Sequence, residues 1–75
     1  MSEIGLTDQD IEHGIRGRLA ADPELNPANI SVHVVAGRAR VGGTAVDEEQ
    51  RRRALEVVGG VPGVREVVDE MTVAG

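Results

Sequence analysis

Several residue types are missing from this chain, and each absence excludes a class of function. Its 75 residues contain no cysteine, which excludes disulfides and cysteine-ligated metals and removes any need for an oxidising compartment. They also contain no Phe, Trp or Tyr, so the core must be built from Val, Ile, Leu, Ala and Met. All eight basic residues are arginine, and the net charge is −5. An acidic chain without aromatics lacks the basic footprint and the stacking platforms of nucleic-acid binders, so we expect no nucleic-acid partner.

Long apolar runs are missing as well. No stretch approaches the roughly 20 apolar residues of a membrane span, so we expect no transmembrane segment. Residues 1–8 have neither the basic nor the apolar region of a secretory signal, which favours a cytoplasmic location. If the sequence is part of a longer chain, we expect a membrane-peripheral or envelope location instead. The length predicts a single domain over residues 1–75, with its core in residues 7–73.

The first predicted helix begins after Thr7, which can cap it. It ends at Asp22-Pro23, because the residue before a proline is driven out of the α region. Its apolar stripe consists of Ile11, Ile15 and Leu19. Gly14 weakens this helix, so we expect a packing reason for it, such as a close approach to the sheet. Leu25 follows in a loop, where we expect it to close one end of the core.

Two strands are predicted to follow as a hairpin. Residues 30–34 alternate apolar and polar side chains, which indicates a half-buried strand. Gly37 supplies the turn, and residues 39–44 form the second strand. Within that strand, Gly43 indicates a bulge or a close contact with a helix.

The second helix is predicted to begin at Asp47 and to end at Gly59-Gly60. Gln50 completes a capping-box-like pair with Asp47. The apolar stripe of this helix consists of Ala54, Val57, Val58 and Val61, with Leu55 at its margin. A final strand follows the turn at Pro62-Gly63, with Val67, Met71 and Val73 on one face. Asp69 falls in that apolar row, so we expect it to lie near a strand end or to accept backbone hydrogen bonds.

The elements therefore follow the order α-β-β-α-β. Two helices with one apolar stripe each need a shared surface, and a three-stranded sheet with one apolar face provides it. The sequence predicts a two-layer α+β sandwich with both helices packed on one face of a three-stranded sheet. The crossover through the second helix predicts a third strand parallel to the second, which makes the sheet mixed if the two strands are neighbours. The pattern leaves open which strand is central.

This order and its turn residues resemble the BON domain, a small module of bacterial envelope, osmotic-stress and channel proteins. The matching positions are Ile11, Ile15, Leu19, Asp22, Leu25, Ile30, Val32, Val34, Gly37, Val41, Gly43, Arg52, Arg53, Ala54, Val61, Gly63, Val64, Val67, Met71 and Val73. The chain departs from the family pattern at Ala39, Gly42 and Asp69. The resemblance implies non-enzymatic binding, since relatives are described as phospholipid- or envelope-associated or as modules for ligand sensing and protein contact. It supplies no catalytic residue.

Two groups of basic residues are candidate binding sites. The run Arg51, Arg52 and Arg53 suits a phosphate or lipid headgroup, but it also suits helix ion pairs. Those pairs are expected between Glu48 and Arg52 and between Glu49 and Arg53. The second candidate is Arg38 and Arg40 with His33 on the neighbouring strand. These two arginines equally suit pairing across strands with Glu66 and Glu70.

No chemistry beyond binding is predicted. His13 and His33 lie on different elements without clustered carboxylates, so we expect no metal site and no cofactor. No Ser or Thr has a neighbouring base, so we expect no enzymatic activity. Two functions remain: a binding or adaptor module that contacts a protein partner or itself, and a module that recognises anionic phospholipid headgroups or small ligands.

Overall fold

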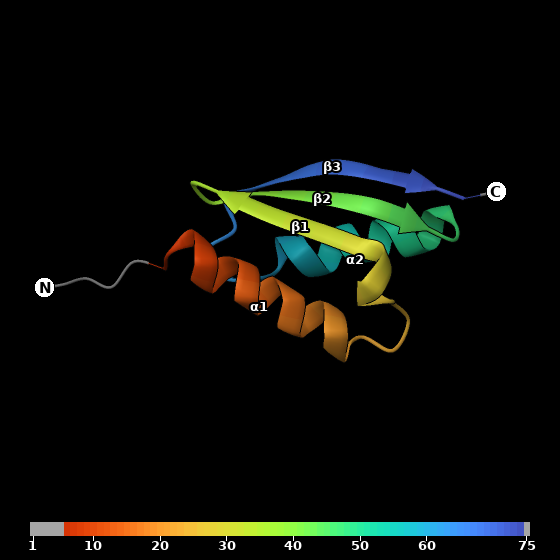
Figure 1. Cartoon of the computed structure of the whole chain (residues 1–75), viewed down its shortest axis with the longest axis horizontal. Coiled ribbons are helices and arrows are strands. Elements are labelled where there is room, and N and C mark those ends of the chain that lie inside the picture. The colour runs from red at the N-terminus through yellow and green to blue at the C-terminus, as the bar shows by residue number, and fades with distance from the viewer. Residues whose placement is uncertain (1–5, 75) are drawn as a thin grey trace, which may run out of the picture.

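The computed structural model describes residues 6–74, which form two layers. The elements are α1 (Asp8–Ala21), a short 3-10 turn η1 (Pro27–Asn29), β1 (Ile30–Val35), β2 (Arg38–Ala45), α2 (Glu48–Gly59) and β3 (Glu66–Val73). Both helices lie on the same side of the three-stranded sheet (Figure 1). The predicted α+β sandwich and its α-β-β-α-β order are confirmed. Neither helix of this described part is long and apolar enough to cross a bilayer.

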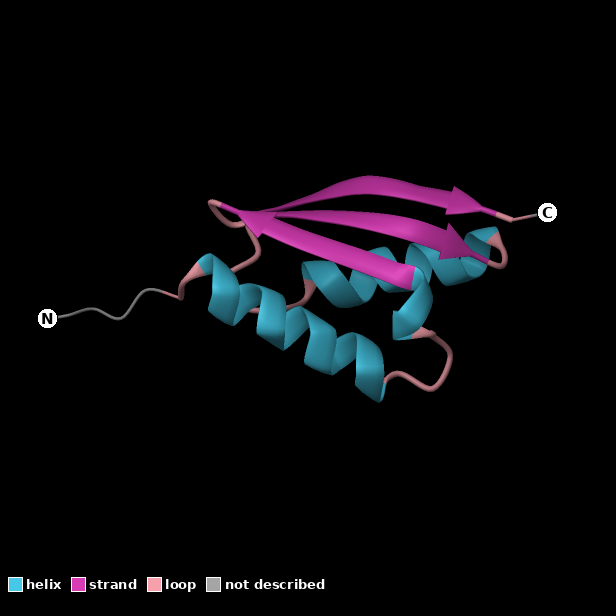
Figure 2. Ribbon diagram, in the orientation of Figure 1, coloured by secondary structure: helices cyan, strands magenta, loops and turns pink. Residues whose placement is uncertain are grey.

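The sheet has the order β1-β2-β3, so β2 is the central strand that the sequence pattern left open. β1 pairs with β2 antiparallel, and β3 pairs with β2 parallel, as the crossover through α2 requires. Figure 2 shows the three strands as one twisted layer above the two helices. The sheet therefore has one face covered by helices, called here the inner face, and one uncovered outer face.

The core is aliphatic throughout and lies between the inner face and the helices. Its buried members are Ile11, Ile15, Leu19, Leu25, Val32, Val34, Ala39, Val41, Ala54, Val58 and Val61. The predicted stripe of α1 is buried, and Leu25 closes one end of the core as expected. Val67 and Met71 pack against this cluster. Val73 shares their face at the end of β3, but it remains 41% exposed.

The start of α1 is fixed by a capping box. The Thr7 hydroxyl accepts a hydrogen bond from the Asp10 amide at 3.1 Å, and the Asp10 carboxylate accepts one from the Thr7 amide at 3.3 Å. The expected packing reason for Gly14 is present, but it is a contact at the end of α2 rather than with the sheet. A Cβ placed on Gly14 would lie 3.4 Å from Cγ1 of Val61, just after α2, so this glycine lets the two helices approach each other.

The β1–β2 turn is bonded to α1 and to the chain before β3. Ala36 and Gly37 both have positive φ, 53° and 81°, which gives the tight two-residue turn that the twist of a hairpin favours. The Asp8 carboxylate accepts hydrogen bonds from their amides at 2.8 and 3.1 Å. The Gly37 carbonyl accepts another from the Arg65 amide at 2.8 Å. Three segments that are distant in the sequence therefore meet at this turn.

Gly43 does not mark a bulge, because it is paired in register with both neighbouring strands. The expected close contact with a helix is present, and it is made with the short 3-10 helix η1 rather than with α1 or α2. Its φ is 110°, a conformation that disfavours any residue with a Cβ. A Cβ at this position would overlap the carbonyl oxygen of Asn29, the last residue of η1. The glycine is needed because the backbone of η1 approaches β2 closely.

The N-terminus of α2 is capped as expected by Asp47, whose carboxylate accepts a hydrogen bond from the Gln50 amide at 2.8 Å. The Gln50 side chain does not complete the predicted capping box with the Asp47 amide. The side-chain oxygen of Gln50 accepts from the Val46 amide at 2.9 Å rather than from the cap residue. Its side-chain nitrogen donates to the Glu24 carbonyl at 3.0 Å, which ties α2 to the loop after α1.

Two glycine-to-alanine substitutions should shift stability in opposite directions. Gly43→Ala introduces both backbone strain and overlap with Asn29, so we expect a loss of about 2 kcal/mol or more in the free energy of unfolding. Gly17→Ala lies in α1 with open space around the new methyl group, so we expect a gain of about 0.5–1 kcal/mol. Urea unfolding followed by circular dichroism measures both. Equal effects at the two positions would contradict the close approach at Gly43.

Candidate functional site

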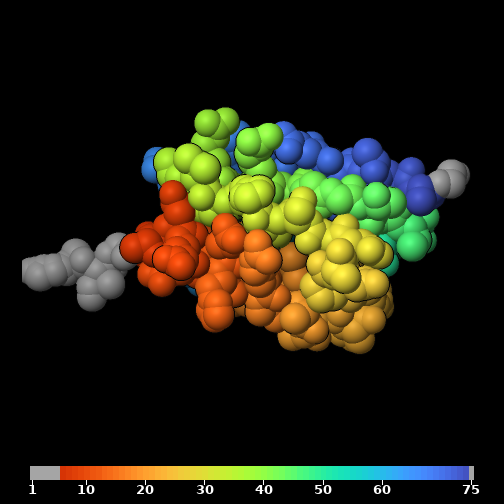
Figure 3. All heavy atoms as spheres, viewed as in Figure 1, coloured from red at the N-terminus to blue at the C-terminus, as the bar shows by residue number. Residues whose placement is uncertain are grey.

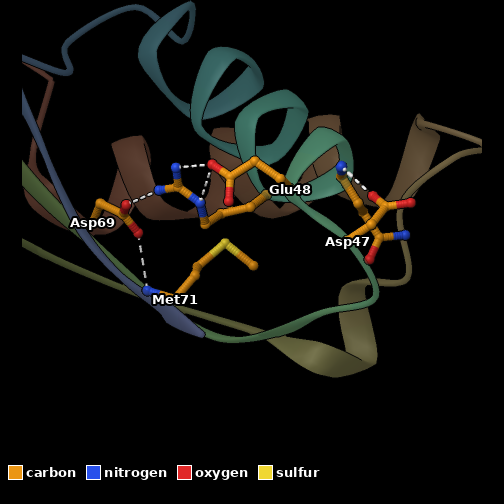
Figure 4. A network of polar contacts seen from close by, with 6 residues as sticks. Asp47, Glu48, Asp69 and Met71 are labelled. Atoms are coloured by element: carbon orange, nitrogen blue, oxygen red, sulfur yellow. Dashed lines mark hydrogen bonds and ion pairs between the residues drawn. The ribbon is translucent and has the colours of Figure 1, made fainter. Parts of the chain in front are cut away.

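The run Arg51–Arg53 does not form one cationic surface, because its side chains point to different parts of the fold. Arg51 points toward the sheet and is paired with both Glu48 and Asp69. Its Nε donates to Glu48 at 2.9 Å, and its Nη1 donates to Asp69. Figure 4 shows Glu48 and Asp69 converging on this guanidinium between α2 and β3. The Arg51 side chain is 25% exposed, much less than its two neighbours in the run.

Arg52 and Arg53 have different partners. Arg52 lies 3.6 Å from the Glu49 carboxylate and remains in solvent. Nε of Arg53 donates at 2.9 Å to Asp22, the C-terminal cap residue of α1, and lies 3.9 Å from Glu24. The side chain of Asp22 is only 8% exposed, so this pair joins the end of α1 to α2.

The predicted pairs Glu48–Arg52 and Glu49–Arg53 are therefore wrong. Glu48 and Glu49 pair instead with the arginines three positions on, Arg51 and Arg52. The rotation of α2 on the sheet explains the difference. This rotation directs Arg51 toward Asp69 on β3 and Arg53 toward Asp22 at the end of α1. Each arginine therefore pairs with a carboxylate that is distant in the sequence.

Asp69 satisfies one of the two alternatives expected for it. It lies within β3 rather than at its end, and its carboxylate accepts a hydrogen bond from the Met71 amide at 3.0 Å. The other carboxylate oxygen pairs with Arg51. A charge in the apolar row of β3 is thus compensated by a backbone donor and a guanidinium.

The second candidate group lies on the outer face of the sheet. Arg38 pairs with Glu66 at 3.1 Å and Arg40 with Glu70 at 3.0 Å, so the expected pairing across strands is confirmed. His33 is exposed and lies opposite Arg40 in the β1–β2 register. An open hollow of about 420 Å³ covers part of this face, and its lining consists of Val35, Arg38, Arg40, Val68 and Glu70.

The six predicted binding residues therefore do not form one site. His33, Arg38 and Arg40 are together on the outer face, whereas the run Arg51–Arg53 belongs to α2 in the other layer. All five arginines have a carboxylate partner within the chain, as described above. A headgroup role for these residues stays a prediction. Within residues 6–74, no three His, Asp or Glu side chains are grouped as a metal site would need.

Sequence reasoning missed two residues that shape these surfaces. Asp22 was identified as a helix end and a family position but not as a partner of Arg53, because nothing local links it to a residue 31 positions away. Arg16 was not singled out, although its Nη2 lies 2.8 Å from Glu12 and 3.5 Å from the Val32 carbonyl of β1. The i,i+4 spacing of Glu12 and Arg16 was a usable signal for the first contact, but the second depends on how α1 packs.

The run Arg51–Arg53 changes the pKa of one neighbouring carboxyl group, that of Glu48. The hydrogen bond from Arg51 lowers the pKa of Glu48 below its ordinary value, although partial desolvation opposes the shift. A lowered pKa means that the ionised form is favoured in the folded state, so its stabilisation is present above the ordinary pKa. That stabilisation is lost as the pH falls through the lower, folded-state value.

The comparisons with known proteins agree with this geometry. The family model of the BON domain matches residues 7–75, nearly the whole chain. The chain belongs to the BON domain family. No curated protein matches this BON domain in sequence.

A solved structure shares the fold of this BON domain. It is that of CdsD, a structural protein of the type III secretion system of Chlamydia trachomatis. The TM-score is 0.73 at 19% sequence identity, and the match covers 89% of this chain. It covers 32% of the CdsD chain, so the BON domain spans about a third of that structure.

Replacing Arg51 should raise the pKa of Glu48. In Arg51→Met, the hydrogen bond and the nearby positive charge are both removed, so we expect the pKa of Glu48 to move up toward its ordinary value. Arg52→Met is the matched control, because Arg52 makes only the smallest contribution and should change this pKa less. NMR titration of the Glu48 side-chain carboxyl carbon measures both. An unchanged pKa in Arg51→Met would show that the Arg51–Glu48 contact is not populated in solution.

Proposed function

We propose that this BON domain is a non-enzymatic adaptor that makes protein–protein contacts through its sheet. The observation that carries the proposal is the uncovered outer face, over which neither helix lies (Figure 1). Val35 is 64% exposed at one end of this face, beside the hollow that Arg38 and Val68 also line. Protein interfaces have an apolar centre surrounded by a polar rim, and Val35 and Val68 with the ion pairs around them could form such an arrangement.

The comparisons support this reading at the level of the fold. CdsD is described as a structural protein of a secretion system, which is a role in an assembly rather than in catalysis. Membership of the BON family likewise implies binding without a catalytic residue. Neither comparison names a partner for this chain, so the proposal is limited to protein contact.

A crosslinking experiment tests the adaptor role directly. A photoreactive p-benzoylphenylalanine replaces Val35 on the outer face, and a control replaces Arg18, which is exposed on α1. In cells that naturally produce the protein, irradiation should give a discrete protein adduct from position 35 and none from position 18. Mass spectrometry identifies the adduct. Absence of any protein adduct from position 35, with full-length protein recovered, would overturn the proposed function.

Recognition of anionic phospholipid is the weaker alternative, because the five arginines of the two candidate groups are already paired with carboxylates. A basic residue near an anionic membrane gains about 1 kcal/mol, but each of these five guanidinium groups must first exchange a carboxylate partner. Such exposed pairs contribute only about 0–1 kcal/mol each, so pairing alone does not prevent exchange. The net charge of −5 adds repulsion from the same membrane. The exchange of ion pairs and the repulsion by the net charge together predict little or no binding to anionic membranes.

Vesicle sedimentation at low salt separates the two functions. With vesicles of phosphatidylserine and phosphatidylcholine, we expect the native chain to remain in the supernatant. The double variant Glu66→Gln/Glu70→Gln releases Arg38 and Arg40 from their partners, so it should bind detectably more. Glu49→Gln releases Arg52 on α2 and serves as the matched control for that surface. Salt-sensitive sedimentation of the native chain would favour the lipid function instead.

A further inference from the structure

The edge of β1 that faces away from β2 carries two backbone amides, those of Val32 and Val34, that have no partner within residues 6–74. Nη2 of Arg16 approaches the Val32 carbonyl from α1, so this carbonyl points away from β2. Residues of an antiparallel strand alternate between the two sides, so the backbone groups of Val34 also point to the free edge. Among residues 6–74, no group outside the β1–β2 ladder bonds to the amides of Val32 or Val34. In the space-filling view, the β1 region lies at the surface beside α1 (Figure 3).

The two edge strands of the sheet, β1 and β3, differ in the charged side chains that oppose the addition of another strand. β3, the other edge, carries the carboxylates of Glu66, Asp69 and Glu70. Charged side chains on an edge strand are a common protection against strand addition. β1, with the sequence Ile-Ser-Val-His-Val-Val, has no Asp, Glu, Lys, Arg or Pro. The β1 edge therefore lacks the protection that β3 has.

Charge is distributed unevenly around this edge. Between Glu24 and Asp47 the chain has no carboxylate, while Arg38 and Arg40 give the hairpin a formal charge of +2. Since the whole chain carries −5, the remainder carries −7. Because Arg38 and Arg40 are themselves paired with Glu66 and Glu70 on β3, what the β1–β2 hairpin contributes at this edge is the absence of a carboxylate of its own.

Arg16 places a cation beside the same edge. Its contact with the Val32 carbonyl is 3.5 Å, at the long limit of a hydrogen bond, and its exposed i,i+4 pair with Glu12 contributes little stability. Its side chain is 61% exposed, and within residues 6–74 no acceptor is bonded to Nη1. When this arginine turns toward a new carboxylate, it releases the carbonyl of Val32, a residue that is only 2% exposed, and the incoming strand must then supply a donor to that carbonyl.

We propose that the β1 edge binds an extended acidic segment of a partner protein by strand addition, with a carboxylate of that segment on Arg16. The inference rests on the proposed adaptor function and assigns it to one edge. Val32 and Val34 are 2% and 8% exposed, so their amides become donors for the added strand only once Arg16 turns away from this edge. The Ile30 amide already donates to the Pro27 carbonyl. A second copy fits less well, because a symmetric β1–β1 pair would bring two Arg16 side chains to the same seam.

NMR titration of the full 75-residue chain tests the edge. The probe is the synthetic peptide acetyl-Thr-Val-Thr-Glu-Thr-Val-Thr-amide, and its Glu→Lys version is the charge control. With millimolar peptide, the largest amide shifts should fall on Val32 and Val34, and the Lys version should bind about tenfold more weakly. Largest shifts on β3 or on the outer face, equal binding of the two peptides, or no binding at all would overturn the assignment.

Substitutions at Arg16 test the cation. Arg16→Glu should reverse the preference, so that the Lys peptide binds better, and Arg16→Gln should abolish discrimination while some binding remains. Arg18→Glu makes the same charge change elsewhere on α1 and should leave the preference unchanged. Circular dichroism establishes that each variant is folded. An Arg16→Glu variant that is folded and still prefers the Glu peptide would overturn the role of Arg16.

Two further outcomes separate this inference from the proposed function. Concentration-dependent shifts of Val32 and Val34 without peptide would show self-pairing, which overturns the acidic partner but retains protein contact. Peptide binding at another part of the sheet would likewise overturn only the β1 edge. Absence of peptide binding together with vesicle binding by the native chain would overturn both.

Discussion

The fold depends on close packing between two helices and one face of a sheet without any aromatic side chain. Small residues make this packing dense, since Ala39, Ala45 and Ala54 are fully buried and Gly14 lies next to Val61. Val, Ile and Leu fill the remaining volume, each contributing about 1.5–3 kcal/mol when fully buried. Such a core has little tolerance for added volume, because protein interiors are already packed to crystal-like density.

Polar side chains at the edge of this core bond the helices to the hairpin turn, to the loop after α1 and to β3. Asp8 bonds the hairpin turn to α1, Gln50 bonds α2 to the loop after α1, and Arg51 bonds α2 to β3. These contacts engage the charges that otherwise suggest a ligand site. The surfaces left for a partner are consequently backbone edges and the outer face, rather than a cluster of free cations.

Most of the architecture was predictable because it depends on local periodicity. The stripe of α1, the hairpin turn at Gly37 and the parallel third strand all followed from residue spacing and connection rules. The partners of Arg51 and Arg53 did not, because they depend on how α2 is rotated against the sheet. The helix that Gly43 contacts could not be identified for a similar reason, since η1 approaches β2 only in the folded chain.

The parallel pairing of β2 with β3 has a consequence for the order of assembly. The hairpin closes over two turn residues, whereas Arg38 and Glu66, paired at the start of the parallel ladder, are 28 positions apart. Closing the longer loop has a larger entropic cost, and α2 must be in place before its contacts compensate for that cost. The last strand should therefore join a preformed helix–hairpin nucleus late in folding and separate from it early in unfolding.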